Sequence, residues 1–514
     1  MSRKSSASRF SSTEEGEYVI LDHQNMLSEE RVRTEKSLKN IFQRIALFRY
    51  DDAKSAVNQA FDSTSKQSGN TACGSSVLGQ LRPIIVNLIE KEREYVQSDL
   101  RKNRSQFIKN IASISQNITG GRNYVPNTVD RLKSDLRAIA SPTRDLGNGS
   151  RDLNSGSRDA GAGTQNDLTA LVRTVSAELD VYVNARFTML HDQVIAEFTK
   201  DAEAAVKTSF CRESLQKLQT VREMTETIRT DALSPLKNML EYETNVVEQL
   251  FSCSLCLAQW DFVGSLLHLQ NYNQTYKEFI EGYKGKERSL MGKKIIKDDE
   301  FPELYKWFYK LYELLLSKYT LYFSKTLFQD SSRKTLRSST TNIADHRMKL
   351  IEFSKKTKAS TISLILNVAN LERPFLGHGC KLFSEQAHRT LSPDLLSQDS
   401  DICLVRSWEL AQRQSYSDKF EVVFHYGKDN KDFKDETLDE DVKNEIVHLY
   451  WDVYHKNGKP YLYDNKKNRS YYLLLFRDEN IFLSVSYNSK RGERESEIVK
   501  FLDDFKNSLN LSKV

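Results

Sequence analysis

The chain has 514 residues, 39% hydrophobic and 28% charged, which suits two or three domains with apolar cores. Its 75 basic and 70 acidic residues leave a net charge of +5, too small an excess to predict strong attraction to nucleic acid. The apolar runs at 361–368 and 471–476 are far shorter than the roughly 20 residues that span a bilayer, and the N-terminus has no signal-peptide core. Six cysteines are too few for a disulfide scaffold. We therefore expect a cytoplasmic protein with no direct membrane insertion.

The N-terminal part alternates between polar segments and helical patterns. Residues 1–27 are polar, serine-rich and without periodicity, which predicts a disordered N-terminus. A helix is expected from about Ser28, because the acidic residues that follow it favour a helix N-terminus. Residues 141–166 repeat Arg-Asp among Gly, Ser and Asn and offer no apolar face. They are interpreted as a flexible insert, with a docking motif as the alternative.

From Asp167 to about Gln329 the apolar residues follow a helical period. Residues 239–267 form the clearest seam of a helical bundle, with apolar residues alternately three and four positions apart. The stretch 301–327 has a second such face, which three further tyrosines widen, so we expect this helix to be covered on more than one side. The face comprises Leu304, Trp307, Phe308, Leu311, Leu315, Tyr319 and Tyr322, and the additional tyrosines are Tyr305, Tyr309 and Tyr312.

After Asp345 the period changes to short runs rich in β-branched and aromatic residues, which predict strands. Four runs are clear and one is weak, and helices are expected at 437–456 and 492–509. The strands are predicted at 361–368, 419–426, 460–463, 470–478 and 481–487. This order is typical of a roadblock or longin-like domain, a five-stranded antiparallel sheet with helices packed on it. We therefore predict an α+β chain with a long-helix bundle at 28–330 and a small roadblock/longin-like domain at 345–514.

Three patterns could carry chemistry, and each has a simpler interpretation. Cys253 and Cys256 form a CxxC, but no second ligand pair has zinc spacing, and the pair lies within a helical seam, where small core residues are expected. His378 lies between glycines that could expose it for ligation or catalysis, or could serve a turn. The acidic run 435–441 could bind a cation, but it lacks EF-hand spacing and is better placed to cap a helix.

Other motifs of enzymes do not occur in the sequence. The glycines at 120–121 are not followed by the Lys-Ser/Thr of a phosphate-binding loop, and no hydrolase, metalloprotease or kinase signature is present. A small basic cluster around 288–297 adjoins carboxylates, so a solvated surface is favoured over a lipid contact. We predict no catalytic, cofactor-binding or metal-binding residues, and a scaffold rather than an enzyme.

Several segments resemble the KICSTOR subunit 2 family in their order and spacing. They are Phe48–Lys54, Tyr182–Arg186, the stretch from Leu233 to Gln270, the aromatic helix at 301–327, the strand segment 363–368, Gly377–Gly379 and the closing segment from Ser484 to Asn510. The resemblance implies a noncatalytic subunit of a KICSTOR-like complex with kaptin, an FG-GAP repeat protein and the large seizure-threshold protein. It further implies that the complex holds GATOR on lysosomes and negatively regulates TOR complex 1 signalling when amino acids or glucose are short.

A longin-like regulator of a small GTPase in membrane traffic is the alternative interpretation. Under either interpretation the chain has no membrane anchor of its own in the sequence, so we expect peripheral recruitment through partner proteins. The aromatic helix carries more rings than one seam requires, and buried aromatics often anchor interfaces. Trp307, Tyr305, Tyr309 and Tyr312 are therefore the candidate partner-docking residues, with packing inside the same chain as the alternative.

Overall fold

A computed structural model describes most of the helices and strands of the chain. The described residues are 14–67, 74–97, 159–191, 204–291, 302–327, 345–368, 419–427, 438–454, 461–464, 468–476, 480–492 and 495–511. The chain divides into two compact units. The first comprises Met1–Asp192, Leu218–Thr244 and Lys297–Leu304, and the second comprises Gln193–Lys217, Asn245–Ile296 and Tyr305–Val514. These limits differ from the predicted domain limits, and whether the helical and α/β parts fold separately stays a prediction.

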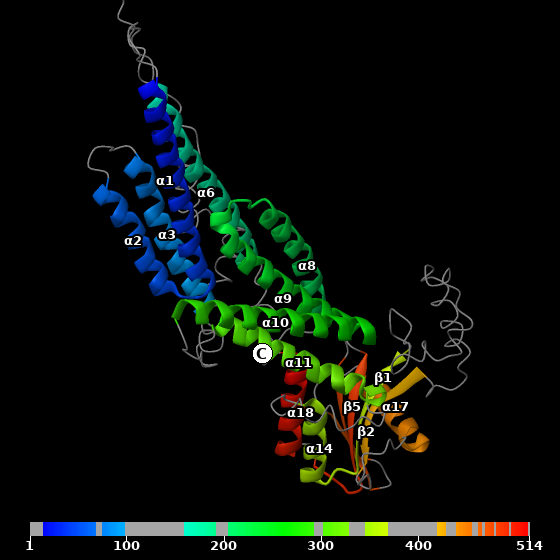
Figure 1. The fold of residues 1–514 in the computed structure, drawn as a ribbon. Coiled ribbons are helices and arrows are strands. Elements are labelled where there is room, and N and C mark those ends of the chain that lie inside the picture. The colour runs from blue at the N-terminus through cyan, green and yellow to red at the C-terminus, as the bar shows by residue number, and fades with distance from the viewer. Residues whose placement is uncertain are drawn as a thin grey trace, which may run out of the picture. The chain divides into compact units, whose positions relative to one another are not determined.

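The first unit is built from long helices packed side by side (Figure 1). They are α1 (Glu14–Ala46), α2 (Tyr50–Gln67), α3 (Gly74–Gln97) and α6 (Asp159–His191), with the short 3-10 helix η1 (Asp231–Leu233). Apolar residues at helical spacing form the core, because each helix turns one stripe inward. Ile45, Val57, Ile85 and Val175 are each fully buried. Between α1 and α2 the chain turns at Phe48, whose φ of 58° is left-handed.

Two helices begin earlier than the sequence predicted. The helix expected from Ser28 begins at Glu14, so residues 14–27 are helical rather than disordered, and α6 begins at Asp159, so the last residues of the predicted flexible insert are helical too. Once a helix is nucleated, each further residue adds a hydrogen bond at little cost, so it can extend into polar sequence. Residues 1–13 and 141–158 lie outside the described part of the chain.

The bundle seam predicted at 239–267 runs through two helices, α9 (Ser234–Ala258) and α10 (Phe262–Met291). α8 (Ala204–Glu226) precedes them. The break lies at Trp260, whose φ is 59°, and the next helix is capped by Asp261, whose carboxylate accepts a hydrogen bond of 2.8 Å from the backbone N–H of Gly264. The three-and-four spacing of apolar residues continues across this corner, so the seam does not reveal the break.

Gly264 is expected to be required at this corner. A Cβ built there would lie 2.4 Å from Asp261 Oδ2 and 2.9 Å from Cys256 Sγ, closer than real Cβ contacts allow. We expect Gly264→Ala to lower the free energy of unfolding by about 1–2 kcal/mol, because the capping carboxylate must move. Gly492→Ala is the matched control, since its Cβ would meet only Glu495 Cγ at 4.0 Å. Urea denaturation of both variants measures the difference, and equal midpoints would contradict this account.

The second unit combines helices with an antiparallel sheet. The aromatic helix predicted at 301–327 is α11 (Glu303–Tyr322) followed after Phe323 by the short α12 (Ser324–Leu327). The sheet order is β2-β1-β5-β4-β3, and its strands lie close to the predicted runs. They are β1 (Thr361–Asn367), β2 (Phe420–Gly427), β3 (Tyr461–Asp464), β4 (Ser470–Phe476) and β5 (Ile481–Tyr487).

Helices cover both faces of the sheet (Figure 1). α17 (Glu440–Tyr454) packs on one face, where Tyr450 stacks on Phe482 of β5 with ring centroids 4.7 Å apart. α14 (His346–Thr357) and α18 (Ser496–Leu509) lie on the other, joined by the stacked rings of Phe353 and Phe501. Strands β4 and β5 are buried along their whole length, as expected for a sheet covered twice.

The α+β class with an antiparallel sheet is confirmed. Its relation to roadblock and longin-like domains stays a prediction. Asp439 caps α17 by accepting from the backbone N–H of Asp441 at 2.9 Å, which supports the capping interpretation of the acidic run. His378, the glycines at 120–121 and the long polar stretch 372–417 lie outside the described residues.

Candidate functional site

A buried ion-pair network lies in the core of the first unit. Arg186 of α6 places its guanidinium between Glu92 of α3 and Glu243 of α9. Its Nη2 lies 2.7 Å from Glu92 Oε2 and 3.2 Å from Glu243 Oε1, and its Nε lies 3.0 Å from Glu92 Oε1. The exposed fractions of Arg186, Glu92 and Glu243 are 4%, 2% and 0%, so the three charges are held away from water.

Two tyrosines complete the network around Glu92. The Tyr182 hydroxyl donates to Glu92 Oε1 at 2.8 Å, and the Tyr50 hydroxyl donates to the Glu92 backbone oxygen at 3.5 Å. Burial, and then the nearby Glu92 carboxylate, raise the pKa of the Tyr182 hydroxyl well above its usual value, so it remains a hydrogen-bond donor. Each carboxylate is matched by donors, as a buried charge requires.

The network connects segments that the sequence resemblance had singled out separately. Tyr50 belongs to the segment 48–54, Tyr182 and Arg186 open and close the segment 182–186, and Glu243 lies in the stretch that begins at Leu233. Sequence reasoning missed Glu92, because a glutamate in a helix resembles any solvated residue. The groups have no access to a substrate, so their geometry suits fixing how α3, α6 and α9 pack rather than catalysis.

A second buried polar cluster joins three elements of the second unit. The Ser317 hydroxyl of α11 accepts a hydrogen bond of 2.7 Å from the backbone N–H of His346. It is also hydrogen-bonded to Nδ1 of the His346 imidazole ring. Nε2 of that ring is 3.3 Å from the Ser508 hydroxyl of α18. Next to it, Lys318 donates to the Leu509 backbone oxygen at 3.3 Å, a favourable place for a cation at a helix C-terminus. His346 is fully buried, so this set ties α11 to α14 and α18 and is closed to a substrate.

The four candidate docking residues of α11 have different environments. Tyr305 and Trp307 are buried, with exposed fractions of 1% and 4%, whereas Tyr309 is 40% exposed and Tyr312 is half-buried. The three tyrosines pair with rings of α10, at centroid distances of 5.2 Å for Phe279 and Tyr305, 5.4 Å for Tyr276 and Tyr309, and 4.6 Å for Tyr272 and Tyr312. Among these four, Tyr309 offers the most surface to a partner, and the docking role stays a prediction.

The CxxC lies in the corner between α9 and α10. Cys253 is 1% exposed and its Sγ lies 3.8 Å from the Ser265 backbone oxygen, while Cys256 is half-buried. Burial, and then the neighbouring Cys256, raise the pKa of the Cys253 thiol far above its usual value, which keeps it protonated. Within the described residues, no group of three or more His, Cys, Asp or Glu side chains could hold a metal ion.

We expect Cys253→Ala to lower the free energy of unfolding by roughly 1–2 kcal/mol, because it removes a small buried side chain from a packed seam. Cys256→Ser is expected to act independently and with a smaller effect, since Cys256 is only half-buried. Denaturation curves of the single and double variants give both values. Stoichiometric zinc in the purified protein that both substitutions abolish would contradict a purely structural role.

The described residues thus define an α+β protein of long helices and a small twice-covered sheet, whose buried polar groups hold helices together. Comparison with known proteins gives the family: residues 28–392 match the family described as KICSTOR complex C12orf66 like, and the chain belongs to it. It is 25% identical over 284 residues to a protein named KICSTOR subunit 2 from Xenopus laevis and 25% identical over 285 residues to one of that name from Danio rerio. Each match covers 55% of this chain, and the chain spans 57% of the length of each relative.

The family matches the resemblance recognised from the sequence. No helix among the described residues is long and apolar enough to cross a membrane.

Proposed function

We propose that this chain is a noncatalytic scaffold subunit of a KICSTOR-like complex. The observation that carries the proposal is the family match over residues 28–392, together with relatives named for a subunit of that complex. The fold is consistent with such a role, because long helices stabilised by buried polar contacts form a rigid frame on which partners can dock. In this proposal the partners are kaptin, an FG-GAP repeat protein and the large seizure-threshold protein.

Through these partners the complex would hold GATOR at the lysosomal membrane and restrain TOR complex 1 when amino acids or glucose are short. The chain itself would be cytoplasmic and recruited peripherally. Surface cations and carboxylates are intermixed on its described helices, as in the pair Lys356 and Glu497 across α14 and α18, so a strong electrostatic attraction to anionic lipid is not expected. We infer that protein partners, rather than lipid, bring it to the lysosome.

Coexpression with the three named subunits tests the proposal. The tagged full-length chain should copurify with them as one peak in gel filtration, should not sediment with anionic liposomes at physiological salt, and should become diffuse in cells after depletion of the large seizure-threshold protein. A chain that binds none of the three subunits and instead accelerates nucleotide release from a small GTPase would favour the alternative, a longin-like GTPase regulator.

The docking role of α11 is tested in the same assay. Tyr309→Ala removes a ring that is 40% exposed, so it should weaken binding to the subunits with little change in melting temperature. Met348→Ala, at 41% exposure on α14, is a control of similar exposure. Equal binding by both variants would remove Tyr309 from the interface.

A further inference from the structure

One face of α10 is free of charge, and the first half of that face is apolar. Val263, Leu266 and Leu267 are exposed by 45%, 43% and 52%, and they lie at the spacing of one helical face. The next exposed positions along the helix are Gln270, Asn271 and Gln274, all uncharged. We call these six residues, from Val263 to Gln274, the neutral strip. It is three turns long, roughly 17 Å at about 1.5 Å per residue.

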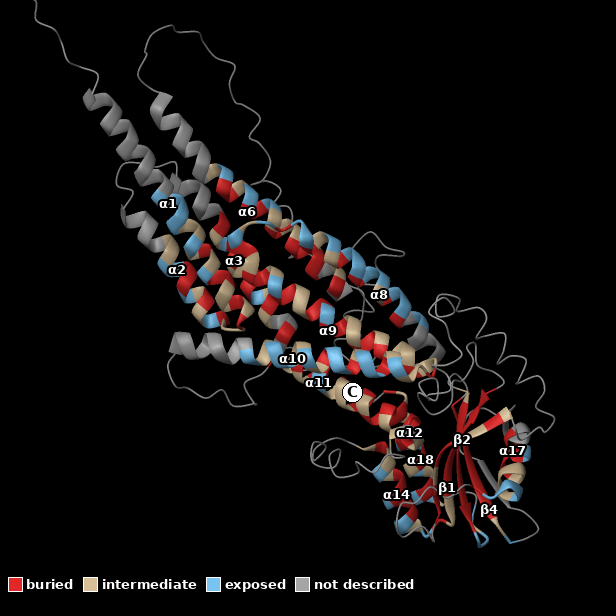
Figure 2. Ribbon diagram, turned by 45° about the vertical axis from the view of Figure 1, so that its right-hand side comes forward, coloured by how far each residue is buried: buried red, intermediate tan, exposed pale blue. Residues whose placement is uncertain are grey.

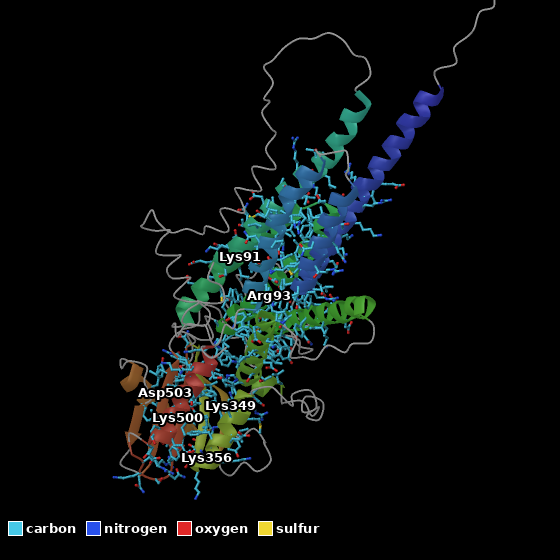
Figure 3. All side chains as sticks on the ribbon, turned by 90° about the vertical axis from the view of Figure 1, so that its left-hand side faces the viewer. Lys91, Arg93, Lys349, Lys356, Lys500 and Asp503 are labelled. Atoms are coloured by element: carbon cyan, nitrogen blue, oxygen red, sulfur yellow. The ribbon has the colours of Figure 1, made fainter. Side chains whose placement is uncertain are left out.

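Figure 2 shows exposed positions along other described helices as well, among them α8, but the residue types at those positions differ from those of the neutral strip. The exposed positions of α8 carry charges of both signs along its length and no large apolar side chain; they include Arg212, Glu213, Lys217, Glu223 and Glu226. The outer sides of α14 and α18 likewise carry Lys356, Lys500 and Asp503 (Figure 3). In a chain with 28% charged residues, an exposed face without charge over three turns therefore requires an explanation.

Charge pattern indicates what covers the strip. The core of a protein interface is depleted of charged residues and the rim is polar. On α10 the strip is bounded by Asp261 before it and by Lys277 and Glu278 after it, so a neutral centre lies between charged ends. A charged partner side chain placed on this centre would lose its hydration without an opposite charge to pair with. The matching partner surface is therefore also uncharged and aliphatic.

The exposed side chains of the strip have the spacing of a helix face, which suits a helical partner. Residues three and four positions apart make ridges that a second helix accommodates in its grooves. We propose that the neutral strip binds an amphipathic helix from another subunit of the complex, with an aliphatic seam flanked by neutral polar residues. This inference rests on the proposed function and adds the surface and the kind of partner segment.

Site-specific crosslinking identifies the occupant. A photo-crosslinking residue at Leu267 of the full-length chain, coexpressed with the three named subunits, should form adducts with a helical segment of one subunit that has aliphatic residues at three-and-four spacing and few charges. Adducts to a second copy of this chain, adducts to a charged or extended segment, or no adducts within an assembled complex would each overturn the inference.

A charge substitution measures the contribution to binding. Leu266→Lys with Leu267→Lys places charge in the neutral strip at exposed positions, so the fold should persist, and affinity for the subunits should fall by about tenfold or more. Gln216→Lys with Thr220→Lys adds the same charge to exposed positions of α8 and should leave affinity unchanged. Unchanged affinity of the α10 variant beside normal wild-type assembly would overturn only this inference. Failure of the wild-type chain to bind the subunits would overturn the proposed function as well.

Discussion

Arg186→Met is expected to lower the free energy of unfolding by about 3–5 kcal/mol, because it leaves two buried carboxylates without their cation. Glu92 and Glu243 are 2% and 0% exposed and both accept hydrogen bonds from the guanidinium, so neither can recover hydration without opening the core. Methionine fills a similar volume, which isolates the loss of charge from the loss of packing.

Arg93→Met is the matched control. Arg93 pairs with Asp51 at 3.0 Å, but the two side chains are 42% and 80% exposed, so their removal should cost no more than about 1 kcal/mol. A triple variant that joins Arg186→Met to Glu92→Gln and Glu243→Gln should recover part of the loss, because neutral amides are less costly to bury than carboxylates. Segment-resolved hydrogen exchange measures the local free energy of unfolding in each variant. This method is suitable because a chain of this size need not unfold in a single two-state step. A loss below about 1 kcal/mol for Arg186→Met would contradict a buried, paired charge.

Phe482→Ala is expected to cost about 3–5 kcal/mol in the α/β part of the chain. Phe482 is fully buried on β5, with its ring 4.7 Å from that of Tyr450 on α17 and 6.1 Å from that of Phe420 on β2. Removal of the ring leaves a cavity between the sheet and α17 that neighbouring strands cannot fill without breaking their ladder. Exchange protection should fall across β5, β1 and α17 together.

Phe482→Leu separates loss of volume from loss of the aromatic contact, and it should recover much of the stability. Val32→Ala, on a residue of α1 that is 61% exposed, should change little. If Phe482→Ala left protection of α17 unaltered, the helix would not depend on this core.

The strands could be predicted because each is a short run of β-branched or aromatic residues between polar segments, and pairing does not alter that composition. The corner at Trp260 could not be predicted, because the apolar residues keep their three-and-four spacing across its left-handed backbone. In retrospect, the signal was Asp261 followed three residues later by Gly264, a helix cap with a residue that has no Cβ to obstruct it.

The ion-pair network was beyond sequence reasoning for a different reason. Glu92, Arg186 and Glu243 are separated by 94 and 57 positions, and a charged residue in a helix usually faces water. Only the packing of α3, α6 and α9 shows that these three face one another. In the aromatic helix, by contrast, the sequence revealed the excess of aromatic rings. It did not reveal that most of these rings pair with rings of α10.

The order of strands in the sheet bears on how this protein is made. β1 lies between β2 and β5 in the sheet. Its pairing with β5 joins residues far apart in the sequence, as in the pair Thr361 and Ser486. During synthesis from the N-terminus, β1 therefore leaves the ribosome before either of its neighbours. Its backbone groups on one edge can pair once β2 is complete, but those on the other edge stay unpaired until residue 487 of β5 has been added. At about 5–20 residues per second, this interval lasts several seconds to about half a minute. The nascent chain should consequently depend on chaperones during this interval, and chains truncated before β5 should aggregate.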